Sequence, residues 1–295
     1  MVNTPVRLAG FGLGLVAVFG AALGLGRAAG PDARPSPAAH GADQHGADQH
    51  GAEPAGSTKI PGGLQVAQDG YRLAPLTDAL SSTGAQPFRF RIIGPAEETV
   101  TAFTTTHERE LHLIVVRRDL TGYQHLHPQR AANGTWEVRL AVAAPGGYRV
   151  FADFQPAGRD EPLTLGVDVP APGDYQPRQL PGPGFVSTVD GYTVTLDGDV
   201  TPGEESQLTA TVSRDGAPVA GLEPYLGALG HLVALRDGDL AYLHVHPEAG
   251  KLAFTVEFPS PGTYRLFLEF KHGGTVRTAE FTLTTEHGEP GHTHG

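Results

Sequence analysis

The chain of 295 residues contains no cysteine, and its only methionine is Met1. The sequence therefore has no disulfide framework, no thiolate metal site, no cysteine nucleophile and no thiol that could carry a bacterial lipid anchor. The lack of further methionines also removes the thioether ligands that favour Cu(I). A metal site in this chain would have to use nitrogen and oxygen ligands.

Basic residues are scarce as well. The 21 Lys and Arg are outnumbered by 32 Asp and Glu, which gives a formal net charge of -11 at pH 7. Nucleic acid and anionic lipid both require clustered cationic side chains, so we expect neither as a partner. The sequence also lacks a G-x-S-x-G nucleophile elbow and a G-x-G-x-x-G motif that opens a dinucleotide-binding unit. We therefore expect a protein that is not an enzyme.

A long apolar segment occurs near the N-terminus. The positive stretch MVNTPVR precedes 19 uncharged residues from Leu8 to Gly26, and Gly26 and Ala28 are small. This order is typical of a secretory signal, and the length also reaches what a membrane-spanning helix needs. Residues 1–29 are thus predicted to form a hydrophobic helix, either a cleaved signal peptide or an uncleaved anchor. In both cases the rest of the chain is exported, and residues 8–26 are its only contact with the membrane.

Low-complexity segments flank the remaining chain. Residues 30–62 are rich in Pro, Gly, Ala and Asp and too poor in apolar residues to form a core, so they are predicted to be a disordered tether. Residues 285–295 form a second His-rich tail. The histidines of the two segments are His40, His45, His50, His287, His292 and His294. They would capture metal ions only loosely, because nothing fixes their geometry.

Two copies of one unit fill the middle of the chain. For example, ELHLIVVRRD at 110–119 corresponds to GHLVALRDGD at 230–239. Each copy contains seven or eight short, alternating apolar segments separated by turn residues, as in an immunoglobulin-like β-sandwich. We predict an all-β protein with one sandwich at 63–169, a Pro- and Gly-rich linker at 170–184 and a second sandwich at 185–284.

Three histidines recur at identical spacing in the two units. His112, His125 and His127 lie 119 residues before His231, His244 and His246, and proline follows each His-x-His step. In the second unit Asp237-Gly238 predicts a two-residue hairpin loop, which would place His231 directly opposite His244. In the first unit, any pairing with the same parity keeps the three imidazoles on one sheet face.

Such a face would hold three ring nitrogens close enough for one divalent ion, which binds imidazole at about 2.0 Å. Ligation by imidazole without sulfur suits Cu(II), Zn(II) or Ni(II), and we favour Cu(II) or Zn(II). Asp153 and Glu269 occupy equivalent places in the two units. They are candidates for a fourth ligand or for an acceptor that orients an imidazole.

A simpler alternative is that these histidines are partly buried and hydrogen-bonded to the backbone, while the carboxylates are solvated. Tyr123 and Tyr242 share the face of the histidines, and we expect both to pack. His107 and His272 have no counterpart in the other unit. We therefore place them on the surface.

The His-x-His-Pro step, written LHVHP in the second copy, and the PG-x-Y strand resemble those of exported bacterial proteins with two immunoglobulin-like repeats and no assigned activity. The resemblance covers about residues 63–283 and implies fold and export. The setting is also similar to that of periplasmic copper-resistance sandwich proteins, which bind Cu(II) through histidines. No position-by-position match to their motif exists, so no residue role is transferred.

A duplicated cupin metalloenzyme is a rival interpretation. Gly238 precedes His244-x-His246 at the spacing of that family's first motif, and Pro145-Gly146-Gly147 resembles part of its second. However, the glutamate expected after His246 and the histidine expected after Gly147 are both missing.

The sequence thus favours an exported, non-enzymatic protein that binds divalent metal ions for sequestration or delivery. The alternative is a metal-free scaffold, anchored in the envelope, that uses its sandwiches to bind another envelope protein.

Overall fold

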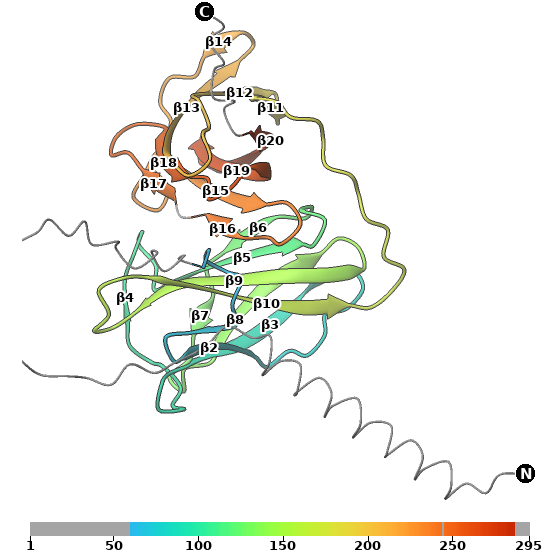
Figure 1. Cartoon of the computed structure of the whole chain (residues 1–295), viewed down its shortest axis with the longest axis vertical. Helices are drawn as coiled ribbons and strands as arrows, with labels where there is room; N and C mark the ends of the chain where they lie inside the picture. Colours follow the sequence, from blue (N-terminus) through green and yellow to red (C-terminus); the bar gives the residue numbers. More distant parts are fainter. Residues whose placement is uncertain (1–59, 244, 287–295) are drawn as a thin grey trace, which may run out of the picture. The chain divides into compact units, whose positions relative to one another are not determined.

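A computed structural model gives the fold of residues 60–243 and 245–286, which is all-β (Figure 1). The predicted N-terminal helix, the tether up to residue 59 and the tail from residue 287 lie outside these ranges. Within them, no helix is long and apolar enough to cross a membrane.

The first repeat contains ten strands in two antiparallel sheets. Their bounds are β1 (Ala67–Gln68), β2 (Tyr71–Pro75), β3 (Gly84–Ile93), β4 (Phe103–Thr104), β5 (Leu111–Arg117), β6 (Gln124–Leu126), β7 (Gln129–Arg130), β8 (Trp136–Val142), β9 (Gly146–Pro156) and β10 (Leu163–Ala171). One sheet has the order β1-β2-β3-β8-β7. The other has the order β10-β9-β5-β6, with β4 paired to β9.

The second repeat has an equivalent arrangement. Its strands are β11 (Val186–Val189), β12 (Tyr192–Asp197), β13 (Glu205–Arg214), β14 (Ala217–Pro218), β15 (Gly230–Arg236), β16 (Tyr242–Leu243), β17 (Val245–Pro247), β18 (Ala253–Glu257), β19 (Gly262–His272) and β20 (Thr275–Thr285). One sheet has the order β11-β12-β13-β18-β17, with β14 paired to β13, and the other has the order β16-β15-β19-β20.

Alternating side chains build the core of each sandwich. In β13, Leu208, Ala210 and Val212 are buried while their neighbours face outward, as expected for a strand with one covered face. Tyr148 and Tyr264 are fully buried, and each hydroxyl donates to a backbone carbonyl four residues upstream, at Ala144 (2.8 Å) and Ser260 (2.7 Å). This is the tyrosine corner of immunoglobulin-like sandwiches. The predicted fold class is confirmed.

Strand β5 differs because all seven of its residues are buried. Leu111, Leu113 and Val115 belong to the core of the first sandwich. The opposite face of β5 packs against the second repeat instead. A separate apolar cluster between the repeats contains Ile114, Val116, Leu120, Phe151, Val233, Leu235, Leu240 and Phe267. His112 lies on this second face, two residues before Ile114, so the predicted histidine face is turned toward the other repeat.

The predicted two-residue hairpin loop in the second repeat is wrong. The observed pairs are Ala234 with Leu243 and Leu235 with Tyr242, a shift of two residues from the predicted register. The reason is local. Asp239 stays in the loop, where it accepts hydrogen bonds from the Arg236 side chain (3.0 Å) and the Ala241 amide (3.1 Å).

The next residue in this loop, Leu240, adopts a φ of 62° and is fully buried in the cluster between the repeats. Burial of a leucine contributes about 2 kcal/mol, comparable to the cost of a left-handed backbone at a residue with a side chain. The loop therefore lengthens in order to place Leu240.

The His-x-His segment of each repeat passes from one sheet to the other. In the first repeat, β6 pairs with β5, whereas β7 pairs with β8. In the second, β16 pairs with β15, whereas β17 pairs with β18 and His246 is opposite Thr255. The predicted pairing of His231 with His244 involves a residue outside the described ranges; the residue opposite His231 in β19 is Glu269.

Residues 62–65 lie against strands of both repeats. The amide of Gly63 donates to Thr164 in β10, the amide of Tyr242 in β16 donates to Gly62 (2.9 Å), and the amide of Gly166 donates to Gln65 (2.8 Å). The sequence assigns Gly62 to the tether, because composition does not reveal this backbone pairing.

Gly166→Ala is expected to detach this segment, because a Cβ at residue 166 would lie 2.0 Å from the carbonyl oxygen of Gly63. We expect a loss of about 1–3 kcal/mol in the free energy of unfolding, typical of overpacking, measured by urea denaturation. Gly182→Ala is the control, since a Cβ there meets no atom within 4 Å and surface changes cost about 0.5 kcal/mol or less. Equal stabilities of the two variants would contradict the prediction.

Candidate metal centre

Three imidazoles of the first repeat converge. His112 comes from β5 and His125 from β6, and His127 follows directly after β6. One ring nitrogen of each lies within 4.8 Å of one ring nitrogen of the other two. The ring centroids are 5.2 Å (His112–His125), 5.2 Å (His112–His127) and 4.9 Å (His125–His127) apart. The sheet face predicted for these three side chains is therefore the observed one.

Backbone contacts fix the tautomer of His112. Its Nε2 lies 3.1 Å from the carbonyl oxygen of Thr106. A carbonyl can only accept, so Nε2 carries the hydrogen and a neutral His112 has its lone pair on Nδ1.

A carboxylate fixes the tautomer of His125 in the same way. Its Nδ1 lies 2.6 Å from Oε2 of Glu269, a residue of β19 in the second repeat. The Nδ1–H donates to this oxygen, so a neutral His125 has its lone pair on Nε2. Both partners are buried, with side-chain exposures of 4% and 7%.

The free ring nitrogens then point at one another. Nδ1 of His112 and Nε2 of His125 are 3.0 Å apart, although in the neutral tautomers neither has a hydrogen to donate. Nε2 of His127 is buried and has no hydrogen-bond partner among the described residues. Such an arrangement is unfavourable unless a proton or a cation lies between the nitrogens. Three nitrogens of this kind form a suitable donor set for a metal ion.

Burial keeps two of these rings neutral. The pKa of His112 is lowered from 6.5 to about 3, mainly by burial of the ring and to a smaller extent by the neighbouring His125. The same two causes in the same order lower the pKa of His127 to about 4. Metal ligation requires neutral imidazole, so His112 and His127 are in the binding form at pH 7.

The second repeat repeats part of this geometry. Nε2 of His231 donates to the carbonyl of Tyr225 at 2.8 Å, as His112 does to the carbonyl of Thr106. Desolvation lowers the pKa of His231 as well. The side chains of His244 and His246 lie outside the described part of the chain, so of the second predicted trio only His231 can be placed.

The two predicted carboxylates lie opposite histidines in their own repeats. Asp153 is the cross-strand neighbour of His112, and Glu269 that of His231. Thr164 donates a hydrogen bond of 2.9 Å to Asp153. Glu269 accepts a hydrogen bond from an imidazole, but that imidazole is His125 of the other repeat.

His107 is exposed as predicted, yet it lies at the edge of the cluster. Its ring centroid is 6.0 Å from that of His112 and 5.6 Å from that of His231, both in edge-to-face contact. Sequence comparison missed this contact because His107 has no histidine counterpart in the second repeat. A signal was present in the apolar run LIVV at 113–116, which is typical of a strand covered on both faces.

Three further side chains considered in the sequence, Tyr123, Tyr242 and His272, make packing or hydrogen-bond contacts outside the cluster of three histidines. Tyr123 stacks on Phe267 with centroids 4.1 Å apart, and Tyr242 contacts Phe151 at 5.6 Å, so both pack as expected. His272 is only half-buried, and its Nδ1 is 2.8 Å from the hydroxyl of Tyr192.

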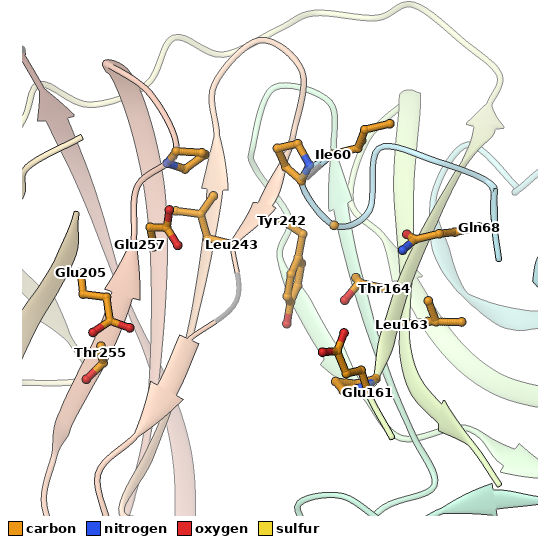
Figure 2. A pocket seen from close by; sticks show the side chains of 14 residues that line it. Ile60, Gln68, Glu161, Leu163, Thr164, Glu205, Tyr242, Leu243, Thr255 and Glu257 are labelled. Atoms are coloured by element: carbon orange, nitrogen blue, oxygen red, sulfur yellow. The ribbon is translucent and has the colours of Figure 1, made fainter. Parts of the chain in front are cut away.

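A cleft of about 550 Å³ lies elsewhere, between Thr164 of the first repeat and Tyr242 of the second. Figure 2 shows Glu205, Thr255 and Glu257 on one side of Tyr242, with Glu161 and Thr164 on the other. None of the three clustered histidines of the first repeat lines the cleft. We base the assignment of a site on the imidazoles, because volume alone provides no metal ligands.

Comparisons with solved structures give distant matches. The chain is 14% identical to FdeC, an Escherichia coli adhesin, over 75% of this chain and 65% of that one, with a TM-score of 0.25. It is 13% identical to invasin, a bacterial integrin-binding protein, over 72% and 39%, with a TM-score of 0.22. The D0-D1 domain of intimin is 12% identical over 72% and 97%, with a TM-score of 0.19. The chain thus spans less than two thirds of the FdeC and invasin chains.

The search of curated proteins gave no match. A family model matches both repeats, at residues 65–175 and 187–287. These segments cover most of the chain and contain both predicted histidine trios. The chain therefore belongs to the family described as Domain of unknown function (DUF8832).

Proposed function

We propose that this protein is an exported, non-enzymatic metal-binding protein that holds Cu(II) or Zn(II) through His112, His125 and His127, for sequestration or delivery. The observation that carries the proposal is the 3.0 Å approach of Nδ1 of His112 to Nε2 of His125, with hydrogens fixed on the opposite nitrogens by Thr106 and Glu269. A divalent cation can bind both lone pairs together with the unpartnered Nε2 of His127.

The simpler interpretation explains only part of this geometry. Buried structural histidines normally use both ring nitrogens in hydrogen bonds. The outer nitrogens of His112 and His125 do so, through Thr106 and Glu269. The inner nitrogens of these two rings lie 3.0 Å apart, where one shared proton would satisfy both. Nε2 of His127 has no partner among the described residues, and it is this third nitrogen that supports ligation.

The hydrogen bond accepted by Glu269 favours metal binding over catalysis. Glu269 already accepts a hydrogen bond from His125, so it is not available as a general base for a metal-bound water. The absence of sulfur from the three-imidazole set favours Cu(II) or Zn(II) over Cu(I).

A second ion is proposed from sequence correspondence. His231, His244 and His246 repeat the spacing of the first trio, and His231 is held by a carbonyl as His112 is. The apolar segment at residues 8–26 supports an extracytoplasmic location, as either a signal peptide or an anchor.

A metal titration of the full chain tests the proposal. The six tail histidines are first changed to alanine, so that only the core binds metal tightly. We expect two equivalents of Cu(II) or Zn(II) by calorimetry against a competing chelator, and one equivalent after H125A and H127A are added.

His272→Ala is the matched control, because His272 is a half-buried histidine outside both trios and should leave the stoichiometry unchanged. A parent chain that binds no ion would instead support the metal-free envelope scaffold. Full retention of binding in the H125A/H127A variant would place the ion elsewhere and contradict the assignment.

A further inference from the structure

We propose that the second repeat completes the metal centre of the first, so that metal binding and docking of the two sandwiches stabilise each other. The inference rests on the proposed function. It adds a positioning residue, Glu269, and a coupling between metal binding and the docking of the two repeats. The first site would then not be formed by its own repeat alone, because a residue of the second repeat contacts one of its ligands.

The first step is the contact between His125 and Glu269. These residues are 144 positions apart, and their 2.6 Å hydrogen bond joins β6 of the first repeat to β19 of the second. A ligand histidine normally donates its outer N–H to such an acceptor, which sets the tautomer and raises the basicity of the inner nitrogen. If the repeats separated, His125 would lose this acceptor, and its ring would be free to rotate and change tautomer.

The second step is enclosure of the site. The ring of Tyr225 in the second repeat lies 6.3 Å from that of His127, and the ring of His231 lies 6.2 Å from that of His125. His231 is in turn held by the Tyr225 carbonyl. The second repeat therefore lies against two of the three ligands, His125 and His127, and partial exclusion of water there strengthens electrostatic interactions at the ion.

The third step is the apolar contact beside the site. Tyr123 stacks on Phe267 at an interplanar angle of 7°, and Ile114 and Phe151 of the first repeat belong to the same cluster as Leu235 of the second. Ile114 is the direct cross-strand partner of His125. Packing of the repeats thus sets the position of the ligand strand. By linkage, an ion that binds the docked form more tightly also favours docking.

Glu269→Ala tests this coupling, in a background that isolates the first site. The full chain carries alanine at the six tail histidines and at His244 and His246. Loss of the acceptor is expected to weaken Zn(II) binding by about 10- to 100-fold. Glu269→Gln keeps a carbonyl acceptor of the same size, so it should recover part of the affinity. Glu280→Gln is the control, because Glu280 lies in β20, the strand paired with β19, and interacts with Arg265 rather than with an imidazole.

Docking is measured in the same proteins by the distance between two spin labels. Since the chain has no cysteine, labels can be placed selectively at A132C and A217C, two exposed positions in different repeats. Zn(II) should narrow the distance distribution in the parent and in E280Q but not in E269A.

The outcomes separate the two proposals. Wild-type affinity in E269A, or a Zn(II)-independent label distance in the parent, would overturn the coupling while the metal site stands. Absence of both Zn(II) and Cu(II) binding in the parent would overturn the proposed function itself. Should E269A fail to fold by circular dichroism, E269Q decides: a loss of affinity relative to E280Q supports the coupling, and equality contradicts it.

Discussion

Asp119→Asn is expected to lower the free energy of unfolding by about 3–5 kcal/mol, because it leaves a buried arginine without its counter-ion. The side chains of Arg117 and Asp119 are only 4% and 5% exposed. Asp119 accepts from Nε of Arg117 (2.9 Å), from the Thr121 hydroxyl (2.7 Å) and from the amide of Arg178 (2.8 Å). An asparagine would turn an N–H toward some of these donors.

Asp239→Asn is the matched control, since Asp239 has the same loop position in the second repeat. Its pair with Arg236 is more open, with side-chain exposures of 21% for Arg236 and 42% for Asp239, and exposed pairs contribute about 0–1 kcal/mol. Urea unfolding can be followed for both repeats by circular dichroism, and for the first repeat by the fluorescence of Trp136, the single tryptophan of the chain. Equal losses in the two variants would show that burial does not decide the strength of these pairs.

The effect of Asp119 should also depend on pH. Burial raises the pKa of Asp119, but hydrogen bonds from Arg117, the Arg178 amide and Thr121 outweigh it and lower the pKa from 3.8 to about 2. A depressed folded-state pKa means that the unfolded chain binds the proton more readily. The stabilisation is therefore complete above about pH 4 and lost as the pH falls toward about 2, so wild type and D119N should converge in acid.

Phe267→Ala is expected to cost about 3–5 kcal/mol, as large aromatic truncations in a packed interior do. Phe267 is fully buried and stacks on Tyr123 across the boundary between the repeats. The loss should act on docking, because the partner ring belongs to the other sandwich. We therefore expect the two repeats to unfold in separate transitions, with only the first followed by Trp136.

Phe254→Ala provides the comparison. Phe254 is 1% exposed but lies in the core of the second sandwich, so its truncation should destabilise that repeat without affecting docking. The spin-label pair distinguishes the two: the distance distribution should broaden in F267A and stay narrow in F254A. A narrow distribution in F267A would mean that the stack does not hold the repeats together.

Much of the fold could be predicted, because it depends on local periodicity. The alternation of apolar and polar residues in segments such as 205–214 shows which face of a strand is buried, whichever element packs on that face. The two copies of the unit give this information twice. The same parity argument brings His112, His125 and His127 together, since side chains two residues apart share a face.

The rest depends on contacts that periodicity does not encode. The loop after Arg236 lengthens because Asp239 caps it and Leu240 is drawn into the cluster between the repeats. The partner of His125 is Glu269, 144 positions away, and a strand pattern cannot say which surface will cover its outer face. His107 reaches the cluster through a backbone with φ 47°, at a position without a histidine in the other copy.

The passage of the His-x-His segment between sheets has a consequence for a chain without disulfides. His125 precedes the crossing, in a strand of one layer, and His127 leads toward β7 in the other. An ion bound by both would cross-link the two sheets at the open edge of the sandwich, where strands most readily fray or pair with other chains. Unlike a disulfide, this cross-link does not depend on thiol redox state, and it would be lost when the metal is removed.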